Sequence, residues 1–380
     1  MQPVFVESHN IVSPLGTGSS ENFSQLKKGI SRVQLHTKID IDDFPFWASL
    51  IEKEQLKTIS SEISNTGDYT RFELLLMASI KDALKSSSVD STNDKTIFIF
   101  STTKGNISLL EQQPASAKLH ERINLHHSAK LITDYFNNYN KPIVISNACI
   151  SGSFAILFAK RLLESSNYEN AIVTGGDTIS KFVFSGFKSF QTLSPGRCKP
   201  FSSDRDGINL GEAAATIILT TKQISNGVRV SGGAVSNDAN HISGPSRTGK
   251  ELSSAINNAI EMAKISSTDI DFISAHGTAT LFNDEMEAKA FNLSHLQDAP
   301  VNGLKGYFGH TLGAAGLVES VISILSMKEG VIIPTIGFSE SGIFPSINVC
   351  RNKIEKEIKH CLKTSSGFGG CNAALVFSKS

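Results

Sequence analysis

Hydrophobic residues along the chain fall into short continuous runs and into longer stretches with helical periodicity. The short runs predict strands in residues 3–8, 96–102, 142–146, 170–176, 215–221, 227–235, 269–275 and 373–379. The longer stretches predict helices in residues 20–29, 71–87, 151–166, 249–265, 284–294 and 312–330. Because strands alternate with helices, we expect an α/β fold.

The same rhythm occurs twice along the chain, with a junction near residues 223–227. It predicts an N-terminal half of residues 1–223 and a C-terminal half of residues 224–380. The two halves share no repeated amino-acid sequence. The similar alternation of predicted strands and helices is therefore the only indication of an internal duplication. Residues 104–127 are polar and weakly patterned, which predicts a long excursion that could be mobile.

Composition narrows the class of protein. The chain has 380 residues, of which 40% are hydrophobic and 19% charged, as in ordinary soluble globular proteins. Its formal net charge is zero, so no overall basic field predicts nucleic-acid binding. The start, "MQPVFVESHNIVSPLG", has no signal-peptide pattern, and apolar runs such as residues 213–219 are too short to span a bilayer. We therefore expect no membrane contact.

The five cysteines are odd in number, and no two form a Cys-x-x-Cys pair. In a large chain without a signal peptide, this predicts reduced thiols in the cytoplasm, with neither a zinc site nor a disulfide framework. Most of these thiols should be inert.

Polar residues with chemical potential follow three strand candidates. Cys149 ends "PIVISNAC", His276 ends "DFISAH", and Lys305 and His310 follow a short extended stretch. Functional groups in open α/β sheets gather beyond the carboxyl ends of strands. Each residue alone is more often structural. Together, and beside glycine-rich backbone, they predict one shared site.

The helix after Cys149 is apolar on nearly every face through Ala159, which predicts burial. The start of a buried helix carries a partial positive charge and free N–H groups. We expect these groups to favour a thiolate at Cys149 and to hold an oxyanion nearby. This is the physical case for Cys149 as a nucleophile.

Several long motifs occur in a fixed order: "NACISG" (147–152), "CKPFSSDRDGINLGEAAA" (198–215), "AHGTATLFNDEMEAKAF" (275–291), "GLKGYFGHTLGAAGLVES" (303–320) and "SSGFGGCNAALVF" (365–377). With them the chain resembles the β-ketoacyl synthases, the decarboxylating condensing enzymes of fatty acid and polyketide synthesis. The resemblance implies a thiolase-like fold, with two duplicated halves in α-β-α-β-α layers. The chain has two histidines instead of one histidine and one asparagine, and in this respect it is similar to the elongating class.

The resemblance also implies roles for individual residues. Cys149 would accept the acyl group, while His276 and His310 would bind the malonyl thioester and stabilise its enolate. Lys305 would order the site electrostatically. The supporting residues implied are Asp284 and Glu287 in a polar network, with Glu287 near Lys305; Phe368 as gate and, with Cys149, as oxyanion hole; Thr278 and Thr280 on the phosphopantetheine arm; and Ile150, Ser366 and Phe187 at the acyl pocket.

These residue types suit the reaction. A thiolate is both nucleophile and leaving group in thioester exchange. Two neutral imidazoles can donate N–H groups to an enolate oxygen. No cofactor or metal is implied beyond the phosphopantetheine of an acyl carrier protein, which would be the partner. A homodimer or a ketosynthase heterodimer is expected.

The chain departs from the family pattern at several positions. Asn147 precedes Ala148 and the cysteine where Thr or Asp is usual, Ser366 stands where a second phenylalanine is common, and Cys371 replaces a common threonine. No catalytic group is removed. Ser366 and Ile150 could reshape the acyl pocket.

Three other functions remain possible from the sequence. The chain could be the catalytic subunit of a heterodimer whose partner sets chain length. It could be a cysteine thioester hydrolase, although Lys305, His310 and the two threonines would then have no task. It could also be a non-catalytic module that binds a carrier protein, although the intact set of site residues argues against this.

Overall fold

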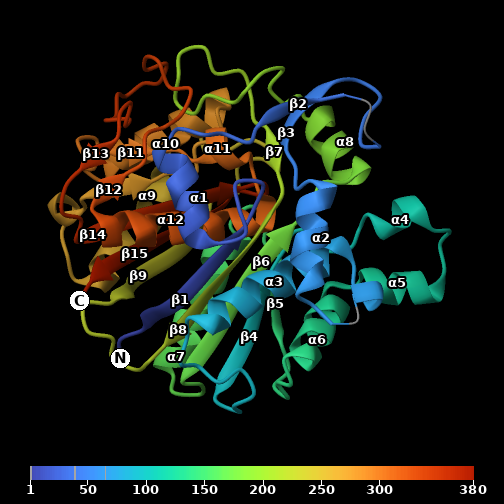
Figure 1. Ribbon diagram of the computed structural model, residues 1–380. Helices are drawn as coiled ribbons and strands as arrows, with labels where there is room; N and C mark the ends of the chain where they lie inside the picture. Colours follow the sequence, from blue (N-terminus) through green and yellow to red (C-terminus); the bar gives the residue numbers. More distant parts are fainter. Residues whose placement is uncertain (1, 38–39, 65) are drawn as a thin grey trace.

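The structure is a computed structural model that describes residues 2–37, 40–64 and 66–380 (Figure 1). The strands are β1 (Phe5–Val12), β2 (Gln34–His36), β3 (Phe46–Ser49), β4 (Thr96–Ser101), β5 (Ile143–Ile145), β6 (Asn170–Asp177), β7 (Leu210–Gly211), β8 (Ala213–Thr220), β9 (Val228–Asn237), β10 (Phe272–Ser274), β11 (Val301–Asn302), β12 (Val331–Ile332), β13 (Ile354–Glu355), β14 (His360–Gly367) and β15 (Cys371–Lys379). The helices are α1 (Ser19–Lys27), α2 (Lys53–Ser61), α3 (Arg71–Lys85), α4 (Leu109–Gln112), α5 (Ala117–Ile123), α6 (Leu125–Tyr135), α7 (Ser151–Glu164), α8 (Lys181–Ser189), α9 (Lys250–Ala263), α10 (Leu281–Leu293), α11 (Lys305–Phe308) and α12 (Ala315–Glu329).

One strand pattern is built twice. The N-terminal strands run in the order β5-β4-β6-β8-β1, and the C-terminal strands run in the order β11-β10-β14-β15-β9. In each set the first three strands are parallel and the last two pairings are antiparallel. The sets join where Phe5 of β1 pairs with Arg229 of β9. Strand order and direction therefore correspond one to one between the halves.

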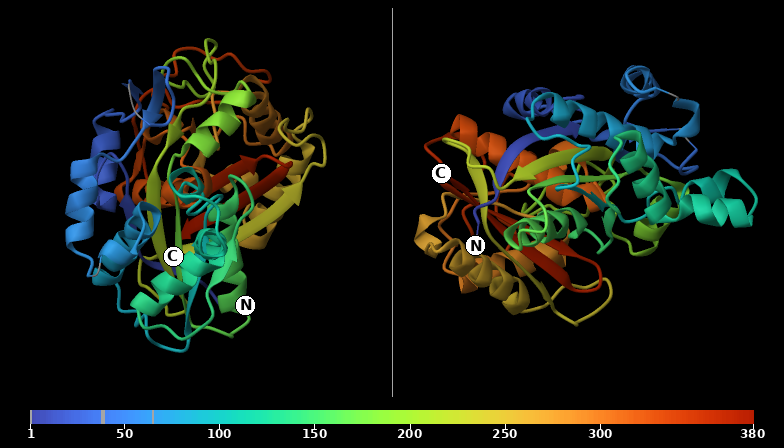
Figure 2. Two further views of the ribbon diagram at one scale, coloured as in Figure 1. Left: turned by 90° about the vertical axis from the view of Figure 1, so that its right-hand side faces the viewer. Right: turned by 90° about the horizontal axis from the view of Figure 1, so that it is seen from below.

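The helices form three layers around these sheets (Figures 1 and 2). Helices α7 and α12 contact each other and strands of both halves, so they form the middle layer. Helix α3 packs on the outer side of the N-terminal strands, whereas α9 covers the C-terminal strands and α10 packs against α9. Strands β4 and β8 are buried along their whole length, because helices cover both of their faces. The predicted thiolase-like arrangement is thus confirmed.

The middle helices approach each other unusually closely at their starts. A Cβ atom on Gly316 would lie 2.3 Å from the amide nitrogen of Ser153, and one on Gly152 would lie 2.8 Å from the amide nitrogen of Leu317. Glycine at both positions removes the side chains that would hold the backbones apart. The residues that precede α7 and α12 are thereby brought together.

All strand and helix candidates correspond to elements of the structure, but several elements were not predicted from the sequence, among them α2, α6, α8 and the central strand β14. Its run "HCLKTSSG" lacks the apolar pattern of a strand, yet Cys361 to Ser366 are buried. Lys363 and Thr364 join polar contacts inside the protein instead of facing water. Because its polar residues are buried, this central strand could not be recognised from hydrophobic periodicity.

Residues 104–127 form the long excursion that the sequence predicted, and its mobility stays a prediction. This segment contains α4 and α5, which lie on the side of the molecule away from the C-terminal half (Figures 1 and 2). Arg122 of α5 binds both carboxylate oxygens of the buried Glu73 in α3. One charged pair therefore anchors a segment whose own sequence is weakly patterned. Among the described residues, no helix has the length and apolar character to cross a membrane.

Candidate active site

Cys149 stands in a tight turn between β5 and the start of α7. The preceding Ala148 has a φ of 43°, a left-handed conformation that is uncommon for a residue with a side chain. The Ser151 hydroxyl holds the turn, because it accepts a hydrogen bond from the Asn147 amide at 2.8 Å and donates one to the Ala148 carbonyl at 2.6 Å. The sulfur is thus presented by a strained, well-tied loop.

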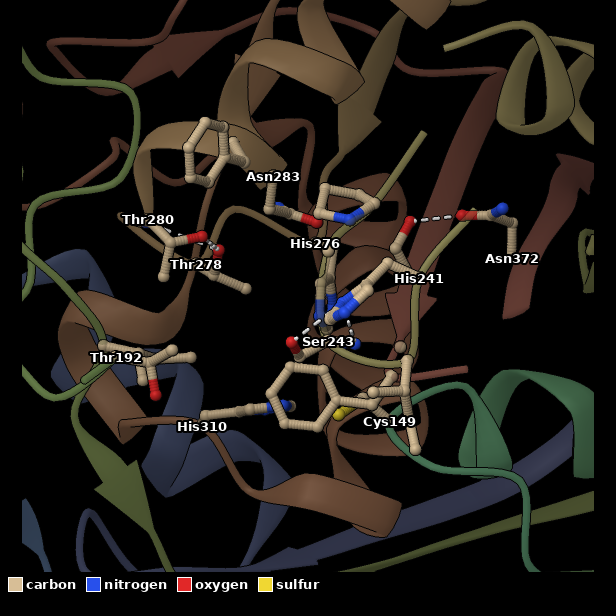
Figure 3. A pocket seen from close by; sticks show the side chains of 18 of the residues that line it. Cys149, Thr192, His241, Ser243, His276, Thr278, Thr280, Asn283, His310 and Asn372 are labelled. Atoms are coloured by element: carbon tan, nitrogen blue, oxygen red, sulfur yellow. Dashed lines mark hydrogen bonds between the residues drawn. The ribbon is translucent and has the colours of Figure 1, made fainter. Parts of the chain in front are cut away.

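Cys149, His276 and His310 come together in one cavity, as predicted from the strand ends (Figure 3). The Sγ atom and one ring nitrogen of each histidine lie within 4.8 Å of one another. The two imidazole rings are 5.2 Å apart and nearly perpendicular, at 83°. His276 follows β10 and His310 precedes α12, so the C-terminal half supplies both rings and the N-terminal half supplies the thiol.

Lys305 lies behind His276 and is fully buried. Its Nζ atom lies 3.1 Å from Nδ1 of His276 and also donates to the carbonyl oxygen of that residue. An ammonium group can only donate hydrogen bonds, so Nδ1 accepts and the ring proton sits on Nε2. The lysine therefore selects the tautomer in which His276 offers an N–H group.

The contact between Lys305 and Nδ1 of His276 also disfavours metal binding at this site. A sulfur and two imidazoles within 4.8 Å are a set that could hold a metal ion. Ligation through Nε2 of His276 would require a proton on Nδ1, which faces the Lys305 ammonium at 3.1 Å. The residues present therefore fit a hydrogen-bond donor better than a metal ligand.

Both histidines are held uncharged. Burial lowers the pKa of each well below 6.5, and the positive charges of Lys305 and Lys363 lower both pKa values further. At neutral pH each ring is therefore a neutral imidazole with one N–H group. Nδ1 of His310 has no hydrogen-bond partner among the described residues.

The expectation of a favoured thiolate at Cys149 was wrong for the resting site. Burial raises the pKa of the Cys149 thiol to about 12, and the nearby Cys371 adds to the rise. The charge of Lys305 and the backbone N–H of Phe368 act in the opposite direction but are smaller effects. Desolvation outweighs the helix terminus, so the thiol is uncharged at neutral pH.

Glu287 lies near enough to Lys305, as predicted, for the lysine charge to oppose the rise that burial gives to the pKa of its carboxyl, but the two residues do not form an ion pair. The partner of Lys305 is Glu319, with Nζ and Oε1 2.7 Å apart. Glu287 instead accepts the backbone amides of His276 at 2.8 Å and Gly277 at 2.7 Å. Its carboxylate thus holds the loop that carries His276, and it belongs to the polar network by a different route.

Asp284 holds the next part of that loop. Its carboxylate accepts the amides of Thr278 at 2.9 Å and Phe201 at 2.7 Å. Burial raises its pKa to about 6, the backbone amide of Phe201 opposes the rise, and the nearby Glu287 adds to it. The hydroxyls of Thr278 and Thr280 lie 2.8 Å apart beside this loop and line the cavity.

Two charged residues of the site were missed by sequence reasoning. Glu319 lies between Lys305 and Lys363, with its second oxygen 2.8 Å from Nζ of Lys363. The signal for Glu319 was a lone carboxylate in the apolar run "GLVESVISIL" of a buried helix. Lys363 gave no such signal, because it lies in the unpredicted strand β14.

Phe368, for which the resemblance implies a role as gate, lies in an aromatic cluster. Its ring centroid is 5.7 Å from that of Phe187 and 5.1 Å from that of Phe190. Phe187 also meets the His310 ring edge-on at 6.3 Å. Both Phe187 and Phe368 line the cavity, whereas Phe190 was not predicted as part of the site.

Of the two residues expected to reshape the acyl pocket, Ser366 lines the cavity and Ile150 does not. Ser366 lines the cavity and donates a hydrogen bond to the Asn372 side chain at 2.8 Å. Ile150 is not among the residues that line this cavity. It packs behind the nucleophile against Cys371 and Ala373.

A loop between β9 and α9 also lines the cavity and was not predicted. It contributes Asp238 and the segment 241–245, which includes His241 (Figure 3). The loop is tied to the glycine-rich turn before β15, since Gly369 donates to the Ile242 carbonyl at 2.7 Å and Asp238 donates to the Gly370 carbonyl at 2.8 Å. The lone histidine in a polar loop was the only available signal.

Comparison with known proteins identifies the family. The model for "Beta-ketoacyl synthase, N-terminal domain" matches residues 1–224, and the model for "Beta-ketoacyl synthase, C-terminal domain" matches residues 228–339. A "3-oxoacyl-[acyl-carrier-protein] synthase 2" of Mycobacterium leprae is 32% identical over 247 residues, or 61% of this chain and 59% of that protein. A putative mitochondrial 3-oxoacyl-[acyl-carrier-protein] synthase of Schizosaccharomyces pombe is 26% identical, over 100% of this chain and 99% of that protein.

A solved structure shows the same fold over the whole chain. A chain of the complex between the ketosynthase ApeO and its chain length factor ApeC, from Xenorhabdus doucetiae, superposes with a TM-score of 0.85. The sequences are 26% identical, and the match covers 100% of this chain and 98% of that chain. Together with the family models, this confirms the resemblance that the sequence motifs indicated: the chain belongs to the β-ketoacyl synthase family.

Proposed function

We propose that the protein catalyses the decarboxylative condensation of an acyl group held on Cys149 with a malonyl thioester. The observation that carries the proposal is the convergence of one thiol and two uncharged imidazoles in one cavity. The substrates would arrive on the phosphopantetheine arm of an acyl carrier protein. Thr278 and Thr280 would contact that arm where they line the cavity.

In the first step, the sulfur of Cys149 attacks the carbonyl carbon of the incoming acyl thioester. The carrier sulfur leaves as a thiol after taking a proton, and the acyl group remains on Cys149. The backbone N–H groups of Cys149 and Phe368 would hold the oxyanion of the tetrahedral intermediate. The Phe368 amide already points at the cysteine sulfur, where it lowers the pKa of the thiol.

In the second step, the malonyl thioester loses carbon dioxide and leaves an enolate. Nε2–H of His276 and an N–H of His310 would donate to its thioester oxygen. Uncharged rings suit this task, because each retains its proton and donates without transferring it. The enolate carbon then attacks the acyl carbonyl on Cys149, the thiolate departs, and a β-ketoacyl thioester is released.

The hydrolase alternative fits the site less well. A cysteine hydrolase needs an imidazole that accepts the thiol proton while its other nitrogen donates to an orienting acceptor. The Lys305 ammonium against Nδ1 of His276 imposes the opposite polarity. A role for His310 as base is not excluded by this contact, but Lys305 and Glu319 would then have no task.

The second candidate is the catalytic subunit of a ketosynthase heterodimer. The solved structure that this chain matches over its whole length is a complex of a ketosynthase, ApeO, with its chain length factor, ApeC. In this chain β5 ends the order of strands, and its residues are only partly buried. An edge strand next to the nucleophile is a suitable place for a second subunit, either another copy or a partner.

A Cys149→Gln variant tests the proposal. Glutamine removes the nucleophile but leaves both histidines, so condensation should be abolished while malonyl decarboxylation persists. The assay measures carbon dioxide release and β-ketoacyl product from malonyl and acyl thioesters of N-acetylcysteamine and of a carrier protein. Condensation by the variant, or loss of decarboxylation in a folded variant, would contradict the mechanism. Intact-mass measurement with a panel of acyl carrier thioesters, with and without candidate partners, would identify the substrate.

A further inference from the structure

Asp177, the last residue of β6, is a buried carboxylate with an unusual set of hydrogen-bond donors. It is 2% exposed and lies between the two halves. One oxygen accepts the Thr102 hydroxyl at 2.7 Å, and the other accepts the Gly313 amide at 2.7 Å and the Thr103 amide at 2.9 Å. The Thr103 hydroxyl and the Lys104 amide complete the set, at 3.0 and 3.2 Å.

Neutral groups alone hold this carboxylate. Within the described ranges, Asp177 has no ion pair with a lysine, arginine or histidine. A buried carboxylate without a cation needs several donors to be tolerated. Every donor here comes either from the loop after β4 or from the turn before α12. Asp177 therefore connects the N-terminal sheet to the turn that carries His310.

His310 is three residues from the Gly313 amide, and its own backbone is held on the other side. Its amide donates to the Asn209 carbonyl at 2.7 Å, and its carbonyl accepts the Gly211 amide at 3.0 Å. The segment between these anchors has little freedom. A Cβ atom on Gly313 would lie 2.7 Å from the Asp177 carboxylate and 2.7 Å from Cα of Thr102.

The same turn also touches the helix of the nucleophile. A Cβ atom on Gly152, in the first turn of α7, would lie 3.0 Å from the Gly313 carbonyl oxygen. The Ser101 hydroxyl donates to that carbonyl oxygen at 3.0 Å. Gly313 is thus fixed through its amide by Asp177 and through its carbonyl by Ser101, at the point where the two middle helices meet.

We propose that Asp177 is a positioning residue, which sets the His310 ring relative to Cys149 through its hydrogen bond to Gly313. The inference rests on the proposed role of His310 in enolate stabilisation. A displacement of about 1 Å in a catalytic group can slow a reaction by up to about a hundredfold. Decarboxylation, which uses the histidines, should therefore respond to Asp177. Acylation of Cys149, which uses the thiol and the Phe368 amide, should not be slowed in the same way: the Asp177 charge adds to the rise that burial gives to the pKa of the Cys149 thiol, so its removal favours the thiolate.

The test separates these two half-reactions. Decarboxylation is measured as carbon dioxide released from malonyl-N-acetylcysteamine, in the Cys149→Gln background. Acylation is measured by intact mass with an acyl-N-acetylcysteamine, in the otherwise unchanged enzyme. Asp177→Ala should lower decarboxylation by between about tenfold and a hundredfold and acylation by less than about threefold. Asp177→Asn should have a smaller effect in the same direction, since one amide oxygen can still accept the Gly313 N–H.

Glu73→Gln is the matched control. Glu73 is also a buried carboxylate that accepts several donors, but they come from Thr70, Asn106 and Arg122, and none comes from the turn before α12. It should lose stability without separating the two half-reactions. Equal losses of decarboxylation and acylation in the Asp177 variants, or a separation as large in Glu73→Gln, would overturn the inference. If His310→Ala decarboxylates normally, the proposed function itself fails, which is a distinguishable result.

Discussion

Lys305 contacts His276 twice, through Nδ1 of the ring at 3.1 Å and through the backbone carbonyl oxygen. The two contacts tie the orientation of the ring to the loop that carries it. The lysine thus sets the tautomer and lowers the pKa of a neighbouring imidazole with one side chain.

Lys305→Met should move the acid limb of the pH–rate profile to higher pH. Burial and then the Lys305 charge lower the pKa of His276, so without the charge that pKa rises toward 6.5. The active ring is neutral, and activity is therefore lost as pH falls through the pKa. Decarboxylation measured from pH 5 to 8.5 should show the shift. Lys289→Met, at a partly exposed pair with Glu285, is the control. An unchanged acid limb in a folded Lys305 variant would refute the electrostatic role.

His276→Ala and His310→Ala should each lower decarboxylation by about a hundredfold or more. Each removes one N–H donor from the enolate oxygen, and such a donor is worth about 3–4 kcal/mol of barrier. Acylation of Cys149 should persist in both variants, as measured by intact mass. Normal condensation in both variants would show that the imidazoles do not stabilise the enolate.

A cerulenin-like epoxide should label Cys149 selectively among the five cysteines, which are all buried and free. Peptide mass spectrometry identifies the labelled residue, and labelling mainly at Cys198 or Cys371 would contradict the assignment. Because burial raises the pKa of the Cys149 thiol to about 12, labelling by iodoacetamide should still accelerate between pH 7 and pH 9. A rate that reaches its plateau below pH 8 would show a much lower pKa.

Arg122→Ala should destabilise the protein by about 2–3 kcal/mol, because it leaves the buried Glu73 carboxylate without its cation. Urea unfolding with the helical signal as readout measures the change. Lys130→Ala breaks only an exposed pair with Asp134 and should change stability by less than about 0.5 kcal/mol. Similar small effects in both variants would mean that the Arg122 pair does not anchor the α4–α5 segment.

Ser366→Phe should shorten the longest acyl chain that Cys149 accepts. Ser366 is 4% exposed and lines the cavity with the nucleophile, so a phenyl ring there would take space from the acyl group. Intact-mass acylation with carrier thioesters of increasing length gives the limit. Ser366→Ala is the control and should keep the original limit. An unchanged limit in Ser366→Phe would place the acyl group elsewhere.

The sequence predicted those reactive residues that stand next to a recognisable apolar strand or helix. Cys149, His276 and His310 each follow or precede a recognisable apolar element, so the ends of strands and helices could be located. The duplicated strand order was visible only as a rhythm, because pairing between distant segments leaves no local signal.

The missed features have a common physical cause. Lys363 and Glu319 are charged residues inside the protein, and their burial depends on partners that are distant in sequence. The pKa of Cys149 depends on how completely the site is desolvated, which a helix start alone does not reveal. Glu287 could be assigned to the polar network but not to its actual partners, the amides of His276 and Gly277.

The close crossing of α7 and α12 has an electrostatic consequence. The two helices are equivalent elements of the duplicated halves, and their starts touch at Gly152 and Gly316. Each start carries about half a positive charge. Cys149 and His310 stand just before these two starts and add no negative charge of their own, so the two starts give the cavity a positive field, which the Asp177 carboxylate at the Gly313 amide partly offsets. Such a field leaves a neutral substrate almost unaffected and favours whatever becomes negative during the reaction, first an oxyanion and then an enolate.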